Sequence, residues 1–214
     1  RQRQMCIRDS FNDLPLERSG RWLPSTDQVI NLAHPRCSQL ARRLSYYRLY
    51  IKKTVGSPST NERSVKAVVA SPGGSGANSL LLETVPWERP NWKALVVSAL
   101  LNSFALDADA RQHIQSNFNL AIMNEVKLPG IVEMPVAPFL AHMALRLTCN
   151  HAGYLDLWEE QLGPEWREEG SSKTWPAVPR SSERWAARSS IDAAIAHAYG
   201  MNRTKYEQLI SLFT

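Results

Sequence analysis

Residues 100–129 read LLNSFALDADARQHIQSNFNLAIMNEVKLP, and this block indicates how the chain folds. Apolar residues at helical spacing lead up to Phe104, and a second helical stretch carries Asp107 and Arg111. Alternating apolar residues in FNLAIMNEV then predict a strand, and Pro129 ends the block. The block contains no nucleophile, metal-ligand cluster or phosphate-binding loop, so its chemistry alone indicates no catalytic function.

Outward from this block, the two halves of the chain have different patterns. RLYIKKTVG, SVKAVVAS and SLLLETV predict three strands before residue 86, separated by turn-rich segments. Amphipathic spacing predicts helices at about 91–100, 139–147, 154–162, 185–198 and 202–213, and a less regular one within 27–47. Gly200 and Asn202 are suited to end one helix and begin the next. LPGIVEMPVAP, from residue 128, predicts an extended, proline-punctuated segment. The expected fold is α+β, with a small mixed or antiparallel sheet of three to four strands in the first 130 residues and a C-terminal helical subdomain.

These patterns divide the chain into three parts. Residues 1–26 are expected to be non-native or disordered, because the first ten lack periodicity. Residues 27–136 are expected to form an α+β domain, and residues 137–214 a helical subdomain. A long loop is expected at about 167–182, where REEGSSKTWPAVPRSS has no period.

Composition limits the function and the compartment. The 214 residues carry a formal net charge of +5, which favours an anionic partner such as nucleic acid. The three cysteines are widely spaced and form no disulfide framework, which fits a cytoplasmic protein. No apolar run reaches the ~18 residues that a membrane span requires, so we expect no membrane partner.

The positive charge is concentrated in one segment. Residues 36–66 contain eight basic residues and one acidic residue, a net charge of +7, whereas residues 154–169 carry −5. One interpretation is a surface that contacts phosphates. The other is a solvated helix face beside an edge strand protected by lysines. The residue pattern weighs these two interpretations about equally.

Three segments resemble the C-terminal specificity region of adenine-specific DNA methyltransferases, of the kind found in type IIG restriction-modification and phage-exclusion systems. Residues 48–73 match a strand, a Ser/Thr-Asn-Glu-Arg-Ser/Thr turn and a second strand that ends in Pro-Gly. Residues 100–129 match through the residues Leu100, Leu101, Asn102, Ser103, Phe104, Asp107, Arg111, Asn119 and Pro129. Residues 189–213 match an Asp-Ala-Ala helix, a Tyr-Gly break and a short helix ending in Ile and Phe. Leu120 and Ala121 depart from the family, which usually has aromatic residues there.

The resemblance implies DNA target recognition for this chain. Double-stranded DNA would be the partner, together with a methyltransferase domain expected N-terminal to Arg1. Whether a restriction nuclease is fused to that domain stays open at this point. That domain would bind S-adenosylmethionine and the flipped adenine, because this chain contains no such cofactor loop and no Asn/Asp-Pro-Pro-Tyr/Phe motif. These 214 residues alone are therefore expected to hold no catalytic residue, cofactor or metal. The candidate DNA-binding residues are Lys52, Lys53, Ser59, Thr60, Asn61, Arg63 and Lys66.

Several of these residues have more than one interpretation. Arg63 can contact guanine, contact a phosphate, or form a structural ion pair with Glu62 or Asp107. Asp107 and Arg111, spaced i and i+4, are expected to pair on the helix surface for about 0.2–0.5 kcal/mol. Asn102 and Ser103 are expected to cap or bond neighbouring backbone. The alternative function for the whole chain is a helical protein-interaction module whose basic face is merely solvated.

Overall fold

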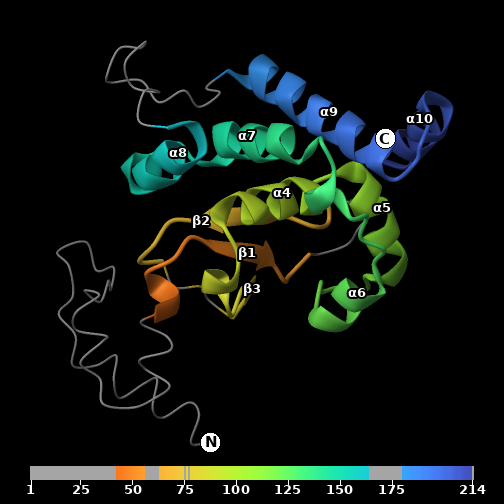
Figure 1. Ribbon diagram of the computed structural model, residues 1–214. Helices are drawn as coiled ribbons and strands as arrows, with labels where there is room; N and C mark the ends of the chain where they lie inside the picture. Colours follow the sequence, from red (N-terminus) through yellow and green to blue (C-terminus); the bar gives the residue numbers. More distant parts are fainter. Residues whose placement is uncertain (1–41, 56–62, 75, 77, 164–179, 214) are drawn as a thin grey trace, which may run out of the picture.

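A small sheet and a stack of helices make up the described part of the chain, which comprises residues 42–55, 63–74, 76, 78–163 and 180–213 of a computed structural model (Figure 1). The sheet lies at one side, with helix α4 (Asn91–Leu101) on it, α7 (Ala137–Thr148) on α4, and α9 (Ser181–Ala198) beyond α7. This arrangement is the predicted α+β class, with its strands early and its helices late.

The sheet has three antiparallel strands in the order β2-β1-β3. The central strand β1 (Arg48–Lys52) pairs on one side with β2 (Ala67–Ala70) and on the other with β3 (Leu80–Leu82). Ile51 lies opposite Ala67 and Leu81. All three strands occur within the segments predicted for them; β1 and β2 contain β-branched or aromatic residues, whereas β3 is a run of leucines.

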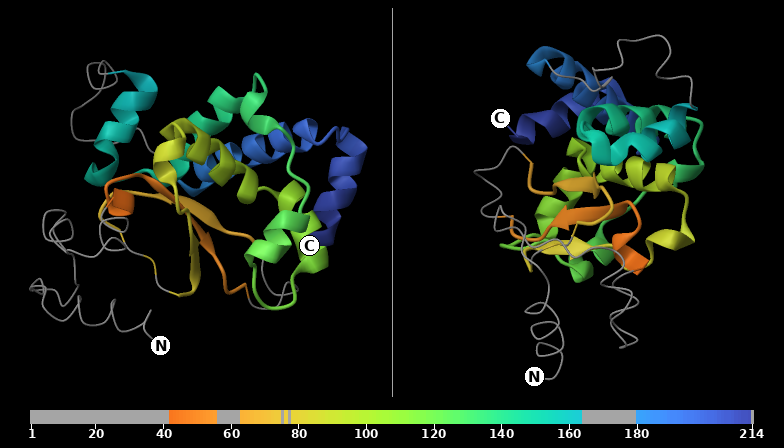
Figure 2. Two further views of the ribbon diagram at one scale, coloured as in Figure 1. Left: turned by 60° about the horizontal axis from the view of Figure 1, so that its bottom comes forward. Right: turned by 90° about the vertical axis from the view of Figure 1, so that its left-hand side faces the viewer.

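Helices account for most of the remaining described residues, and Figure 2 shows their layering from two further directions. The other helices are α5 (Phe104–His113), α6 (Leu120–Glu125), α8 (Leu155–Leu162) and α10 (Arg203–Ile210). The 3-10 helices are η2 (Pro86–Glu88), η3 (Ile131–Glu133), η4 (Ala152–Tyr154) and η6 (Ser211–Phe213).

Helix α4 is the centre of the hydrophobic core. Leu95 and Val96 are fully buried, because the helix has the sheet on one side and α7 on the other. A helix enclosed on both sides is apolar around most of its circumference, as α4 is. One hydrophobic cluster extends from Tyr47 to Ile195 and so runs across residue 136, where the sequence suggests a subdomain boundary.

The strand predicted over FNLAIMNEV is wrong, because residues from Leu120 onward form helix α6. The side chain of Asn119 accepts a hydrogen bond from the backbone N–H of Ile122 at 3.0 Å and so caps the helix. Ile122 is buried, whereas Leu120 is 65% exposed, so the alternating pattern does not mark a buried face. Extended pairing occurs only before α6, where Phe118 N–H donates to the Lys53 carbonyl at 2.8 Å. The extended segment predicted from residue 128 likewise contains a helical turn, η3.

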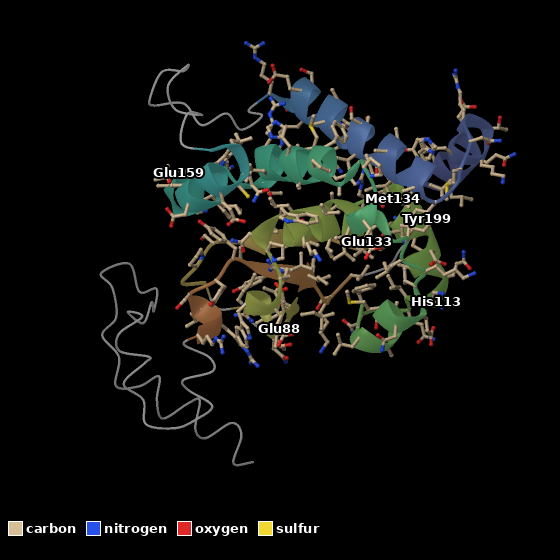
Figure 3. All side chains as sticks on the ribbon, in the orientation of Figure 1. Glu88, His113, Glu133, Met134, Glu159 and Tyr199 are labelled. Carbon is tan, nitrogen blue, oxygen red and sulfur yellow. The ribbon has the colours of Figure 1, made fainter. Side chains whose placement is uncertain are left out.

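The C-terminal helices fold back onto α5. Gly200, at φ +72°, ends α9, and the Asn202 side chain caps α10, as predicted. Tyr199, labelled in Figure 3, donates its hydroxyl to the Lys127 carbonyl at 2.8 Å. Phe213 lies against Phe104, with ring centroids 4.7 Å apart. The final helices are therefore attached to the block that begins at residue 100.

Some predictions fall outside the described residues. These are the segment 1–26, most of the helix within 27–47, and the loop at 167–182 up to residue 179. Within the described ranges, no helix combines the length and apolar character needed to span a membrane.

Candidate nucleic-acid interface

The predicted DNA-binding residues have different environments. Lys52 and Lys66 are exposed, and Lys53 is half-buried. The backbone N–H of Lys52 donates to the Lys66 carbonyl at 2.8 Å, so these two lysines are cross-strand neighbours at the end of the β1–β2 pair. Ser59, Thr60 and Asn61 lie outside the described residues.

Arg63 is buried, with 6% of its surface exposed. Its guanidinium donates to Asp192 Oδ2 at 2.6 Å and to the carbonyl of Asn102, and it lies 3.9 Å from the centre of the Phe104 ring. Of the three roles considered for Arg63, the one observed is an ion pair within the protein. Its carboxylate partner is Asp192, which lies 129 residues away in the sequence and was not among the expected partners.

Asp107 is fully buried, not on the helix surface as predicted. It does pair with Arg111, whose Nε donates at 2.9 Å. Its carboxylate also accepts the backbone N–H of Ser64 at 2.9 Å and of Val65 at 2.7 Å. Asp107 is buried because the backbone N–H groups that follow Arg63 are themselves buried and need an acceptor. The Asp107 carboxylate accepts their hydrogen bonds.

Asp192, on α9, forms hydrogen bonds with Arg63 and with the start of α5. Its Oδ1 accepts the backbone N–H of Phe104 at 2.9 Å, while its Oδ2 accepts from Arg63. Burial raises the pKa of Asp192, and the nearby Arg63 guanidinium and the Phe104 N–H oppose this rise. Arg63, Asp107, Arg111 and Asp192 are called the buried charge cluster below.

Asn102 closes the outer edge of β2. Its side-chain amide donates to the Ala67 carbonyl at 2.7 Å and accepts from the Ala67 N–H at 3.1 Å, as a neighbouring strand would. The predicted hydrogen bond to nearby backbone is also present, because the Asn102 amide donates to the Ser98 carbonyl at 2.8 Å. Ser103 caps α5 by accepting from Leu106 N–H at 3.3 Å, as expected.

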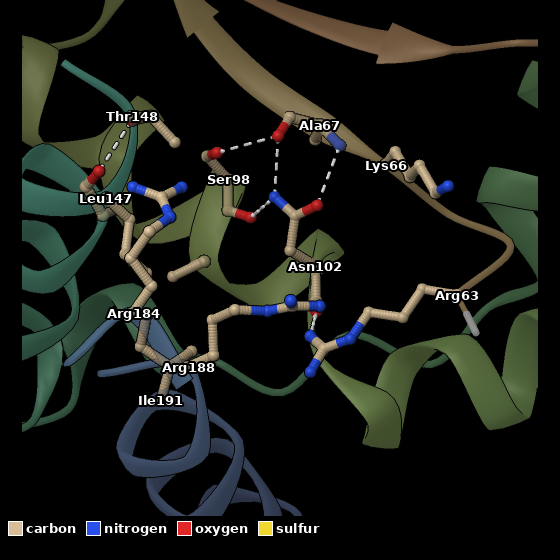
Figure 4. A pocket seen from close by; sticks show the side chains of 12 residues that line it. Arg63, Lys66, Ala67, Ser98, Asn102, Leu147, Thr148, Arg184, Arg188 and Ile191 are labelled. Carbon is tan, nitrogen blue, oxygen red and sulfur yellow. Dashed lines mark hydrogen bonds between the residues drawn. The ribbon is translucent and has the colours of Figure 1, made fainter. Parts of the chain in front are cut away.

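A cleft of about 420 Å³ opens beside this cluster, between the start of β2 and helices α4, α7 and α9 (Figure 4). We call it the basic cleft, and its lining residues are Arg63, Lys66, Ala67, Ser98, Ala99, Asn102, Ala144, Leu147, Thr148, Arg184, Arg188 and Ile191. Four of these side chains are cationic and none is a carboxylate. Figure 4 shows the Arg188 side chain extending from α9 toward Asn102 and Arg63.

Arg184 and Arg188 are not among the predicted DNA-binding residues. Their i, i+4 spacing on α9 places both on one helix face, and that spacing is visible in the sequence. The opposite wall of the cleft is contributed by residues between 63 and 102, and no local pattern indicates that α9 lies there.

Cys149 and His151, which lie close together in the sequence, have structural roles. Cys149 is buried, which raises the pKa of its thiol to about 11. The His151 ring nitrogen accepts the backbone N–H of Gly153 at 3.1 Å and caps η4. Among residues 42–55, 63–74, 76, 78–163 and 180–213, no three His, Cys, Asp or Glu side chains are grouped to hold a metal ion.

Comparison with known proteins does not assign the chain to a family: no family model matches it, and neither a curated protein nor a solved structure does.

Proposed function

We propose that this chain is the DNA target-recognition part of a site-specific adenine DNA methyltransferase. In this role it binds duplex DNA and presents an adenine to a catalytic domain. That domain supplies S-adenosylmethionine and receives the base once it has rotated out of the stack. The chain itself contributes affinity and sequence selection, and the methyl transfer takes place elsewhere.

The observation that carries the proposal is the convergence of the three segments that resemble the family. Arg63 from the first segment donates to Asn102 of the second and to Asp192 of the third, and Asp107 of the second accepts from the backbone N–H of Ser64 in the first. Residues that match at separate places in the sequence thus belong to one buried unit. A chance resemblance would not place its matching residues in contact, so the convergence supports treating the three matches as one.

The cross-strand lysines support the anionic partner. Lys52 and Lys66 are neighbours across β1 and β2, and both are exposed. Like charges in facing positions of an antiparallel pair destabilise the pair, and a phosphate between them removes this repulsion. A merely solvated face gains nothing from placing two lysines opposite each other.

The proposal divides the contacts by type. Lys52, Lys53 and Lys66 contact phosphates, which position the duplex without selecting a sequence. We assign the contacts with base edges to the residues between β1 and β2 in the sequence, namely Ser59, Thr60 and Asn61. Asn can form two hydrogen bonds with adenine, and Ser or Thr can form hydrogen bonds with any of the bases. Arg63 is assigned to holding the start of the second strand through Asp192.

The salt dependence of DNA binding tests this proposal. The dissociation constant for a fluorescent duplex is measured by anisotropy between about 50 and 200 mM salt, where each phosphate contact contributes a slope of about −0.9 to log K against log salt. The double substitution K52Q/K66Q should make the slope of log K against log salt shallower by roughly 1.8, because two phosphate contacts are lost. K127Q, which removes an exposed lysine beyond α6, is the matched control and should leave the slope unchanged.

Two results would contradict the proposal. One is the absence of measurable binding by the folded, unsubstituted chain at about 50 mM salt, where phosphate contacts are strongest. The other is equal loss of slope in the K127Q control and the K52Q/K66Q variant, which indicates attraction by net charge alone. Either result favours the helical protein-interaction module.

A further inference from the structure

We infer that Thr54 and Asn117 contact base edges in the major groove of DNA, with Asn117 reading an adenine. This inference rests on the proposed function and deepens it. The proposed function assigns base contacts only to residues 59–61. The inference adds a residue from the segment between α5 and α6, which pairs with the chain that leaves β1.

A two-stranded ribbon brings these residues together. Strand β1 points toward the side of the molecule where α5 and α6 lie (Figure 1). Beyond its end, Thr54 and Asn117 are paired antiparallel. The flanking N–H groups of Phe118 and Val55 donate across the pair at 2.8 Å and 3.2 Å. Thr54 and Asn117 therefore form the kind of pair whose Cα atoms are only about 4.5 Å apart, so their side chains lie close together. We call this pairing the two-stranded ribbon, and it consists of residues 53–55 and 116–118.

The two-stranded ribbon turns one face to the core and the other to solvent. Val55 and Phe118, on the first face, are 5% and 1% exposed and belong to the hydrophobic core. Thr54 and Asn117, on the second face, are exposed. Because side chains alternate between the faces of an extended chain, burial of one face fixes the direction of the other. The two polar side chains are thus directed outward from a rigid support, as a recognition site requires.

The Asn117 side chain has hydrogen-bonding capacity left for a ligand. Within the part of the chain that the structure describes, its amide makes one side-chain hydrogen bond, to Ser116 Oγ at 3.4 Å. That distance is longer than the usual range of about 2.7–3.2 Å. The side chain of Asn119, two residues later, is used differently, because it caps α6 by accepting from the Ile122 N–H at 3.0 Å. A carboxamide has two N–H donors and a carbonyl acceptor, so most of the capacity of Asn117 remains.

The exposed lysines of β1 and β2 lie on the same face as Thr54 and Asn117. Lys52 precedes Thr54 by two residues, so both side chains point to one side of the extended chain. Burial over residues 51–55 agrees, since Lys52 and Thr54 are its two exposed residues. Lys66 is the neighbour of Lys52 across β1 and β2. The proposed phosphate contacts and the two polar side chains therefore share one surface.

The shape and chemistry of this surface suit the major groove. That groove is about 12 Å wide and admits a two-stranded β-ribbon. Asparagine matches adenine there, because its carboxamide donates to N7 and accepts from the N6 amino group. The Thr54 hydroxyl is suited to hydrogen-bond the edge of a neighbouring base. The lysines on the same face are suited to the phosphates, which set the register of the duplex on the protein.

Selection of binding sites from a pool of random DNA duplexes tests the inference. The full 214-residue chain is equilibrated with the pool, and the bound duplexes are sequenced. The unsubstituted chain should enrich adenine at one position. N117A should reduce that preference by about 5- to 140-fold, the discrimination that one bidentate base contact provides. Its slope of log K against log salt should not change, because no phosphate contact is lost.

Further variants separate base reading from other roles of Asn117. N117Q keeps the carboxamide and should still select adenine. N117D replaces it with an acceptor-only carboxylate and should favour cytosine, whose N4 amino group donates. T54V loses the hydroxyl and should weaken the preference at the adjacent base pair. N150A is the matched control, because Asn150 is an exposed asparagine after α7, and it should select the same sequences as the unsubstituted chain.

The outcomes distinguish this inference from the proposed function. If the unsubstituted chain selects a sequence and N117A selects the same one, the inference is overturned and the proposed function stands. If the unsubstituted chain binds no DNA, both fail. If it binds DNA but enriches no base, the inference is overturned and only the phosphate contacts stand. Equal weakening at every position in N117A would assign Asn117 to holding the two-stranded ribbon, which also overturns the inference. Should N117A fail to fold, N117D decides, and an unchanged preference for adenine in that variant overturns the inference.

Discussion

The buried charge cluster and the exposed lysine pair Lys52 and Lys66 place their charges differently. In the cluster each guanidinium has a carboxylate, with Arg63 on Asp192 at 2.6 Å and Arg111 on Asp107 at 2.9 Å. At the end of the β1–β2 pair two like charges face each other across the strands, and both are exposed. Charge that is compensated inside the protein stabilises the fold, whereas exposed charges of one sign attract an anionic ligand.

The largest expected effect follows from removing a carboxylate of the buried charge cluster. D192A should lower the free energy of unfolding by about 3–5 kcal/mol, because it leaves the Arg63 guanidinium buried without its charge partner. The Phe104 N–H also loses its acceptor. Urea denaturation followed by circular dichroism measures the change.

Two further variants control for this result. E207A removes the carboxylate of an exposed ion pair with Arg203 at 2.7 Å, and it should cost less than about 1 kcal/mol. R63M/D192L replaces both buried charges by apolar side chains and should recover most of the stability lost in D192A. Equal costs for D192A and E207A would show that the cluster is not a structural element.

Asn102 should have the next largest effect. N102A leaves the N–H and carbonyl of Ala67 without their side-chain partners at the edge of β2, and it should cost about 1–3 kcal/mol. The exposed Asn124 on α6 provides the matched control N124A, expected within about 0.5 kcal/mol of the unsubstituted chain. A cost for N102A that does not exceed the control would mean that the edge of β2 needs no cover.

The cleft arginines should have a smaller effect on stability than Asp192. R184Q/R188Q should cost less free energy of unfolding than D192A, because both arginines are partly exposed whereas Asp192 is buried. The same denaturation experiment provides the measurement. A loss as large as that of D192A would place Arg184 and Arg188 with the structural charges of the cluster.

The reactivity of the Cys149 thiol tests whether the wall of the cleft stays closed. It follows Thr148, which lines the cleft, and burial raises the pKa of its thiol to about 11. At about pH 8 only roughly one thiol in a thousand is then ionised, and the thiolate is the reactive form. Mass spectrometry of iodoacetamide-treated protein should find Cys149 unmodified until urea unfolds the chain. Rapid modification of the folded protein would show that the wall opens.

Much of the fold could be predicted because its patterns are local. The strands β1 and β2 and the helices α4, α7 and α9 follow from apolar spacing within single segments. The error over residues 118–126 arose from three alternating apolar residues, whose period outweighed the capping signal of Asn119. Short apolar runs fit a strand and a helix alike, so a cap is the better guide there.

The site could be predicted only in part. Lys52 and Lys66 are exposed, as candidate phosphate contacts must be, and strand position alone made this plausible. The pairing of Arg63 with Asp192 spans 129 residues and has no local signal. Asp107 was placed on a surface because i, i+4 spacing reports a pair but not its burial. The cleft depends on α9 lying near β2, which is a tertiary fact.

The contrast between the buried charge cluster and the exposed lysine pair is tested most directly by the salt slope of DNA binding for two variants measured side by side. R63M/D192L removes one positive and one negative charge from the cluster and leaves the net charge unchanged, so its slope should equal that of the unsubstituted chain. K52Q/K66Q should lose roughly 1.8 of slope, from two phosphate contacts. The reverse pattern, a reduced slope for R63M/D192L and an unchanged one for K52Q/K66Q, would contradict the account and return Arg63 to the DNA-binding surface.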